Sequence, residues 1–244
     1  NGGSITATGA VSLGEAVTLG AATTVAGTNV TFASTVDGAR SLTVNASGVT
    51  TFGDVVGGTT PLASLTTDAA GSVQLNGTAI TTSGAISFND NATLGTDVTL
   101  ATTNANVLFN GTVNSANATA RDLTINAGSG AIRLASSVGT TQALDAVTLN
   151  STGATRLDGA LTLSSLTTDT GGTLAFNGGT VTATGDISFG EAVTLGATTT
   201  IIGQAVTFAS TIDGAQALTV NASGATIFGD VVGGTTPLAS LTTD

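Results

Sequence analysis

The stretch VNASGVTTFGDVVGGTTPLASLTTD at residues 44–68 returns almost unchanged as VNASGATIFGDVVGGTTPLASLTTD at residues 220–244. The match extends backwards, so that residues 1–68 align with 177–244 without a gap, at roughly four identical positions in five. A catalytic site is needed once in a domain, whereas a unit that stacks on its neighbours is needed many times. The duplication therefore predicts a repeat architecture.

Substitutions between the two copies separate an inner from an outer set of positions. Val11 becomes Ile187, which keeps an apolar side chain of different size, whereas Arg40 becomes Gln216. Buried sites tolerate the first kind of change and solvent-facing sites the second. Apolar residues therefore face a common interior.

Short phrases of alternating polar and apolar residues recur inside the long repeat. One type ends on Phe or Leu, at residues 29–32, 49–52, 72–75, 131–134, 154–157, 173–176 and 205–208. A second type lies between them, at residues 41–44, 61–65, 122–125, 146–149 and 217–220. Alternation and many β-branched residues predict strands, and helix signals are nearly absent.

The spacing of these phrases predicts one coil of a solenoid roughly every 20–25 residues. Two longer intervals are expected to hold an extra short coil, built on residues 91–94 and 192–195. The sequence thus predicts an all-β parallel β-helix of about eleven coils, roughly 50 Å long at ~4.8 Å per layer. Residues 1–244 would form one continuous segment, and Asn1 already lies inside the repeat, so we expect an excerpt of a longer chain.

Turn residues and stacking complete this prediction. Asp37-Gly38 and Asp213-Gly214 supply the backbone conformations that tight corners need. Stacked coils place like residues above one another, so Asn side chains are expected to bond along the stack and Phe side chains to form interior columns.

Composition excludes several classes of function. The chain has no Lys, His, Cys, Met, Trp or Tyr, and its net charge is −11 with Arg40, Arg121, Arg133 and Arg156 as its cations. Nucleic-acid binding and docking on anionic lipid both depend on basic residues, so neither is expected. Zinc sites, His-based triads, thiol nucleophiles and P-loops lack their residues. The sequence contains no apolar run of about 18 residues, so no transmembrane helix is predicted.

Carboxylates are the remaining candidates for chemistry. Asp54 and Asp230 recur in the phrase FGDVV, while Asp68, Asp169 and Asp244 recur in LTTD. A glycosidase needs two carboxyls about 5 to 10 Å apart in a cleft, one of them held protonated by burial. The alternative is that each Asp caps a turn or keeps the rod soluble, and we adopt it: no catalytic, cofactor or metal site is expected.

Two further polar patterns remain open. Residues 89–97 concentrate oxygen ligands for calcium but lack the spacing of an EF-hand loop, so a plain polar turn is the alternative. Asn29, Asn45, Asn76 and Asn110 begin Asn-x-Ser/Thr triplets, the acceptor pattern for N-glycosylation.

The repeated Val-x-Phe, turn, Leu-Thr-Val-Asn-Ala-Ser-Gly phrasing without Cys resembles the shaft of filamentous haemagglutinin-like surface proteins exported by two-partner secretion. Autotransporter passengers are similar in the same way. The resemblance covers essentially the whole chain and implies a right-handed β-helix outside the bacterial cell, with an outer-membrane secretion partner. Right-handedness agrees with the general preference of parallel crossover connections.

We therefore expect a structural stalk or fibre segment of an extracellular adhesin or matrix filament. Its partners would be further solenoid repeats of the same chain or end-to-end copies, with a carbohydrate or other cell-surface partner in addition. The alternative is a flat Thr-rich face for glycan or ice, for which Thr180–Thr182 and Thr198–Thr200 are the candidate rows. A polysaccharide-active enzyme ranks third.

Overall fold

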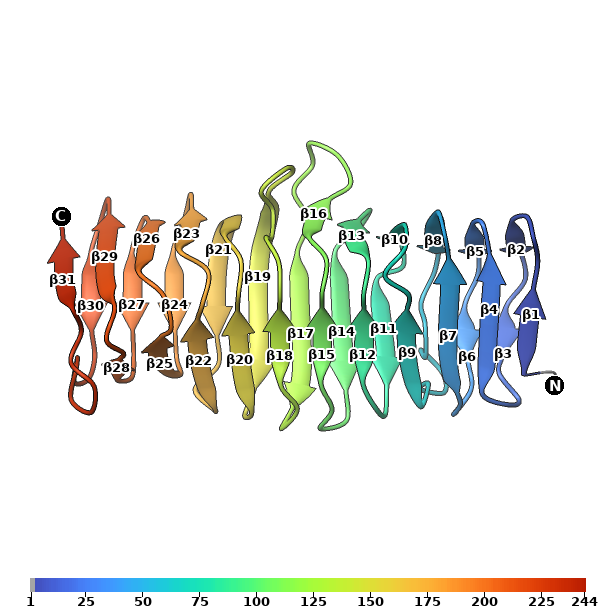
Figure 1. Cartoon of the computed structure of the whole chain (residues 1–244), viewed down its shortest axis with the longest axis horizontal. Helices are drawn as coiled ribbons and strands as arrows, with labels where there is room; N and C mark the ends of the chain where they lie inside the picture. The colour runs from blue at the N-terminus through green and yellow to red at the C-terminus, as the bar shows by residue number, and fades with distance from the viewer. Residues whose placement is uncertain (1–2) are drawn as a thin grey trace.

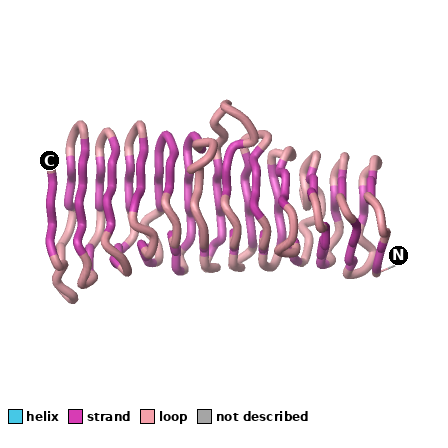
Figure 2. The backbone as a smooth tube through the Cα atoms, turned by 45° about the horizontal axis from the view of Figure 1, so that its top comes forward, coloured by secondary structure: helices cyan, strands magenta, loops and turns pink. Residues whose placement is uncertain are grey.

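Short strands wind around one long axis and form a parallel β-solenoid of about 12 turns (Figure 1). This computed structural model describes residues 3–244 and contains no helix in that range. The turns differ in length, since one leads from Val25 to Val44 and a longer one from Val107 to Ile132. The termini lie at opposite ends of the rod (Figure 2). The all-β solenoid is therefore confirmed, with a turn number close to the predicted eleven.

The first face of the solenoid is an eleven-stranded parallel sheet along the rod. In stack order its strands are β1 (Ser4–Thr6), β4 (Thr23–Gly27), β7 (Ser41–Ala46), β9 (Ser64–Thr67), β12 (Ile86–Phe88), β15 (Val107–Phe109), β18 (Ile132–Leu134), β20 (Ala154–Leu157), β22 (Thr173–Phe176), β25 (Ala192–Leu195) and β28 (Ile212–Asp213).

The second face follows the first in every turn, and a bridge through Val138 joins its two parts. Its strands are β2 (Val11–Leu13), β5 (Val30–Phe32), β8 (Val49–Phe52), β10 (Ser72–Leu75), β13 (Asn91–Leu94), β16 (Val113–Ser115), the start of β21 (Leu161–Thr168), β23 (Thr180–Ala183), β26 (Thr199–Gly203), β29 (Ala217–Ala222) and β31 (Ser240–Thr243).

The third face closes each turn, and Val56 bridges its first strands to the rest. Its strands are β3 (Val17–Thr18), β6 (Val36–Asp37), β11 (Ala79–Thr82), β14 (Val98–Thr102), β17 (Leu123–Gly128), β19 (Leu144–Ser151), the end of β21, β24 (Ile187–Phe189), β27 (Val206–Phe208) and β30 (Thr226–Phe228). β21 turns a corner, because Leu163 pairs with β23 and Leu166 with β24. The loop between β16 and β17 projects from the rod (Figures 1 and 2).

Apolar side chains from the three faces fill one continuous interior. Alternation places Val30 and Phe32 inside and Thr31 outside, which is the strand pattern that the sequence predicts. Phe32 stacks on Phe52 with ring centroids 5.4 Å apart. Asn stacking also occurs, since Asn150 Nδ2 donates to Asn126 Oδ1 over 2.8 Å. The predicted columns of like residues are therefore present.

The two copies of the long repeat occupy different faces. Along the first face, eight strand pairings lead from β1 to β22. The next strand in the chain is β23, which is the counterpart of β1 in the second copy of the repeat. β23 lies on the second face. In the same way β5 on the second face corresponds to β27 on the third, and β6 on the third to β28 on the first. The copies are therefore offset by eight turns and one face.

This offset changes the meaning of the two phrase types read from the sequence. Each turn has three faces, and phrases of the first type lie on the second face at β5, the first face at β18 and the third face at β27. The phrases mark strands correctly but do not mark faces. The shortest third-face strands, β3 and β6 with two residues each, escape sequence analysis, whereas β17 and β19 on the same face overlap the predicted phrases 122–125 and 146–149.

Candidate functional site

A ladder of hydroxyl side chains runs along the outside of the third face. Strand pairing places six Thr or Ser residues directly above one another on consecutive turns, in the order Thr99, Thr124, Thr148, Thr167, Ser188 and Thr207. Neighbouring strands are about 4.8 Å apart, so the ladder is roughly 24 Å long. Ala101, Asn126 and Asn150 occupy the next outward column, so hydroxyls form a single row on this face.

The Thr rows predicted from the sequence lie on the second face. Thr180 and Thr182 both point outward from β23, and Thr180 pairs with Thr200. That row continues through Thr219 to Thr242, but Thr182 is followed by Ile202. The structure therefore brings Thr180 and Thr200 together, whereas the longest ladder, on the third face, was missed.

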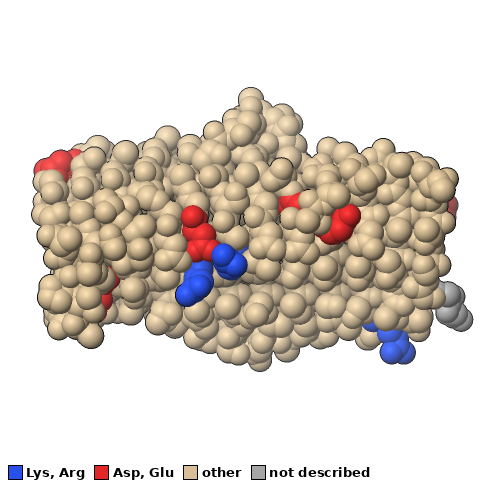
Figure 3. Space-filling view, viewed as in Figure 1, with Lys and Arg blue, Asp and Glu red and all other residues tan. Residues whose placement is uncertain are grey.

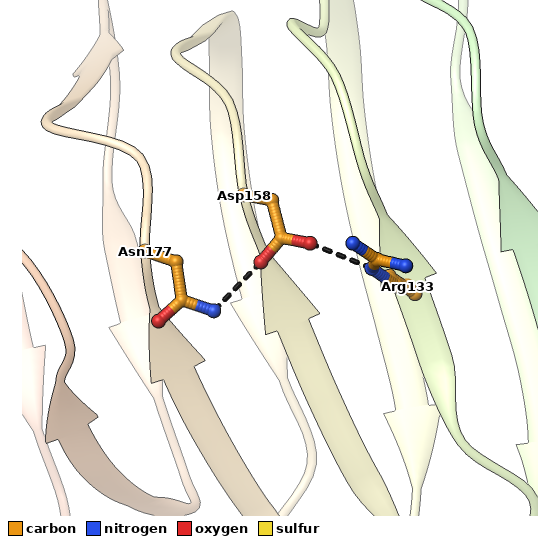
Figure 4. Close-up of polar contacts among 3 residues, drawn as sticks. All are labelled: Arg133, Asp158 and Asn177. Carbon is orange, nitrogen blue, oxygen red and sulfur yellow. Dashed lines mark hydrogen bonds and ion pairs between the residues drawn. The ribbon is translucent and has the colours of Figure 1, made fainter.

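A charged cluster interrupts the first face near the middle of the rod. Arg133 and Arg156 are direct pairing partners in β18 and β20. Arg133 Nε donates to Asp158 Oδ2 over 2.6 Å, and Asn177 Nδ2 donates to Asp158 Oδ1 over 2.7 Å (Figure 4). Acidic and basic side chains lie together there, on a surface that is mostly uncharged (Figure 3).

The ionisation of Asp158 follows from these contacts. Burial alone would raise the pKa of Asp158, but the hydrogen bonds from Asn177 and Arg133 and the charges of Arg133 and Arg156 outweigh it. The pKa of Asp158 is therefore held below its ordinary value. The side chain of Arg133 is 49% exposed, so the pair is a surface ion pair of small energy.

A shallow depression of about 250 Å³ lies beside the two arginines. It is lined by Ala85, Ser87, Asn106, Val107, Leu108, Ala131, Ile132, Arg133 and Arg156. An aliphatic strip next to two guanidinium groups suits an anion with an apolar part. No sequence signal marks it, because Arg133 and Arg156 are distant in the chain and meet only through strand register.

Four of the five predicted aspartates accept backbone hydrogen bonds at corners, whereas Asp169 Oδ1 is buried without a partner, so the prediction of a turn cap is wrong there. Asp54 Oδ1 accepts from the Val55 N–H over 2.7 Å, and Asp230 makes the same bond to Val231. Asp68 Oδ1 accepts from the Ala46 N–H, one turn before it in the stack. Asp54 follows the second face and Asp230 the third, so the structure does not bring them together.

The oxygen-rich segment 89–97 does not converge on one point. Asn89 Nδ2 donates to the Thr67 carbonyl and Asn91 Oδ1 accepts from the Thr112 N–H, while Asp97 Oδ1 accepts from the Asp122 N–H at another corner. Within residues 3–244 no group of three or more acidic side chains is placed to hold a metal ion. Asn29 also bonds along the stack, since its Oδ1 accepts from the Val49 N–H.

Two carboxyls are buried, which the sequence analysis did not predict, although it included Asp90 in the oxygen-rich segment 89–97. Asp90 is 3% exposed and Glu191 is 1% exposed. Burial, and then the nearby charge of Asp169, raise the pKa of Glu191 to about 8. A protonated acid beside a second carboxyl is one requirement of a glycosidase, but Glu191 points into the solenoid interior, where a sugar ring cannot reach it.

Comparison of the chain with models of protein families, with curated proteins and with solved structures gives no match. No helix that could cross a membrane occurs in the part of the chain that the structure describes. Function is therefore inferred from the architecture and surfaces above.

Proposed function

We propose that this chain is a stalk or fibre segment of a large extracellular bacterial adhesin or matrix filament, and that it supplies length and rigidity without catalysis. The observation that carries the proposal is the continuous apolar interior, in which buried side chains stack along about 12 turns. Each turn buries its apolar face on its neighbours, so adding turns extends the rod without new chemistry.

The change of face between the two copies supports a mechanical role. The same sequence lies on the first face in β1 and β4 and on the second face in β23 and β26. A surface selected for one partner would keep its residues on one side of the rod. What both copies keep is the interior and the corners.

The proposed setting follows from the resemblance to filamentous haemagglutinin-like shafts. It places the chain at the cell surface, after export by an outer-membrane partner, and joins it to further solenoid repeats of the same chain or to other copies end to end. The absence of Cys fits export in an unfolded state, because no disulfide can form prematurely.

A tandem chain tests the stalk proposal. Asp244 corresponds to Asp68, so residues 1–244 followed by a second copy of 69–244 continue the repeat in phase. We expect one straight rod that is longer by eight turns and one face, or roughly 40 Å at about 4.8 Å per turn, in electron micrographs. A control in which Asp244 is followed directly by Ile80 breaks this phase and should kink or unfold at the junction. A tandem chain no longer than the original would contradict the proposal.

A flat binding face is the second candidate function, and the six-rung ladder on the third face favours it. A row of hydroxyls at regular spacing suits a repetitive polar surface such as a polysaccharide or ice. Thr148→Arg would place a long charged side chain in the middle of the ladder. Co-sedimentation with insoluble polysaccharide, and ice-recrystallisation assays, should detect binding that this variant loses and that the second-face variant Thr31→Arg keeps.

A further inference from the structure

The two buried acids belong to one recurring sequence motif. The phrase LTTD at residues 65–68 is followed one turn later by ISFND at 86–90, and LTTD at 166–169 is followed by ISFGE at 187–191. Strand pairing places Ile86 beside Leu65 and Ile187 beside Leu166. Each motif therefore brings an acid to a corner of the solenoid near the Asp of LTTD, one residue beyond the position that aligns with that Asp. The first corner joins the first and second faces, and the second joins the third and first.

In the first corner, Asp90 points inward onto Thr67. Thr67 Oγ1 donates to Asp90 Oδ1 over 2.7 Å and accepts from the Asn89 N–H over 3.2 Å. Asp90 Oδ2 is buried without a hydrogen-bond partner. Asp68 is the charged group that acts on Asp90, and it raises the pKa of Asp90 in addition to the larger effect of burial.

The second corner repeats this arrangement with a longer acid. Thr168 Oγ1 accepts from the Gly190 N–H over 3.1 Å, as Thr67 does from Asn89. Glu191 Oε1 is 3.3 Å from the Thr155 hydroxyl, two turns earlier, whereas Glu191 Oε2 and Asp169 Oδ1 are buried without partners. Asp169 is the charged group that acts on Glu191, and the two carboxyls lie within hydrogen-bonding reach.

Two ionised carboxylates in such a corner would be unfavourable. Each would lose hydration, and they would repel one another at low dielectric. A proton on one acid removes a charge and turns an unpartnered oxygen into a donor for the other carboxyl. In the second corner the unpartnered oxygens of Glu191 and Asp169 are those that a shared proton would satisfy, and in the first corner a proton on Asp90 would remove the buried charge of its unpartnered oxygen.

We propose that each corner is a proton-binding site, in which one carboxyl of the pair stays protonated in the folded solenoid at neutral pH and the turns loosen when that proton leaves. The two sites lie between β9 and β13 and between β21 and β25. This inference concerns the solenoid itself and does not depend on the stalk function.

The direction of the pH effect follows from the raised pKa of Glu191. The folded value of about 8 lies above the ordinary value of 4.5, so stability is full below 4.5 and is lost as the pH rises through about 8. Within that window Glu191 makes the unfolding equilibrium constant about tenfold larger per pH unit, and the raised pKa of Asp90 acts in the same direction. Because the chain lacks His, Cys, Lys and Tyr, the amino terminus is the group outside the two corners that is expected to titrate between pH 6 and 9.

Urea unfolding of the 244-residue chain between pH 5 and 9 tests the proposal. Glu191→Gln keeps the shape of the protonated acid and should make the unfolding constant at pH 9 more than about tenfold smaller than in the parent, with little change at pH 5. Asp90→Asn should act in the same direction. Glu15→Gln is the matched control, because Glu15 is the counterpart of Glu191 in the first copy and is exposed. It should follow the parent at every pH.

A direct measurement on the unchanged chain completes the test. Carbon-13 NMR spectra of the side-chain carboxyls should show one Glu signal that is still protonated at pH 6. The signal is assigned to Glu191 if it is lost in Glu191→Gln. A Glu191 signal that is ionised at pH 6, or a Glu191→Gln variant that matches the parent at pH 9, would overturn the proposal. So would stabilisation of the parent by calcium chloride that Glu191→Gln abolishes, because the corner would then bind a metal cation.

Discussion

The first and last quarters of the chain have nearly the same sequence but face different directions. Phe32 and Phe52 stack with ring centroids 5.4 Å apart and an interplanar angle of 7°, and Phe208 and Phe228 repeat this at 5.5 Å and 8°. The first pair lies on the second face and the other on the third. Local geometry is therefore preserved although the position around the axis has changed.

Corner contacts agree in the same way. Asp37 Oδ1 accepts from the N–H groups of Thr59 and Thr60 over 2.8 and 2.9 Å, and Asp213 makes the corresponding two bonds at the same distances. A corner is thus built by its own residues and by the turn next to it. The three faces are interchangeable, since each offers a parallel sheet outside and apolar columns inside.

Removing a stacked ring should have the largest effect and tests whether the two faces are energetically equal. Phe32 and Phe208 are each 1% exposed. Replacing either by Ala leaves a cavity and should cost about 3–5 kcal/mol in local stability, with the two values within about 1 kcal/mol of each other. Native-state hydrogen exchange of the amides in the affected turns measures this cost. A large loss at one position and a small loss at the other would show that the faces differ.

A pair of glycines should give a smaller effect and shows what a stacked turn adds to it, because another turn lies on Gly57 whereas Gly233 lies in the last turn of the 244 residues. Gly57 and Gly233 have φ values of 70° and 71°, so Ala at either position is strained. A Cβ on Gly57 would also lie 2.1 Å from the Thr81 carbonyl oxygen in the next turn, whereas the nearest atom to a Cβ on Gly233 is 3.2 Å away.

Gly233→Ala should therefore cost about 1–2 kcal/mol, from backbone strain. Gly57→Ala should cost about 1–3 kcal/mol more, because the neighbouring turn must move. Thermal unfolding of both variants against the parent checks the order. Equal losses would mean that the turn above Gly57 yields at no cost.

The sequence predicts the strands of this fold better than their arrangement. Phrases such as residues 49–52 and 72–75 coincide with β8 and β10, because alternation and β-branching are local properties. Which face a strand joins depends on the summed lengths of all preceding turns. Those lengths are unequal, as the short turn from Val25 to Val44 and the longer one from Val107 to Ile132 show. The offset between the copies is therefore not visible without the register.

The candidate sites were predicted less well for the same reason. Thr99 and Thr124 look unrelated in the sequence and become neighbours through pairing across one turn. The sequence does contain a signal for the buried acids. The number of residues from the Asp of LTTD to the next acid is the same for Asp90 as for Glu191. That step is one residue longer than the turn set by the pairing of Leu65 with Ile86 and of Leu166 with Ile187, so each acid follows the residue that aligns with the Asp in the corner.

A substitution that makes the first copy of the repeat more like the second should have the smallest effect on stability. Arg40 corresponds to Gln216, and the backbone around the two residues is the same. The N–H of each donates to the carbonyl two residues earlier, and the carbonyl of each accepts a 3.0 Å bond, from Ala63 or from Ala239. Arg40 is exposed and makes no ion pair within residues 3–244.

Arg40→Gln should therefore change the free energy of unfolding by less than about 0.5 kcal/mol. The change removes one of four cations from a chain of net charge −11, so any small loss should come from long-range repulsion among carboxylates. Such a loss should shrink in high salt, because exposed charges are screened over about 10 Å at 0.1 M. A loss above about 1 kcal/mol that salt does not reduce would instead show that the first copy depends on a specific contact of Arg40 that the second copy lacks.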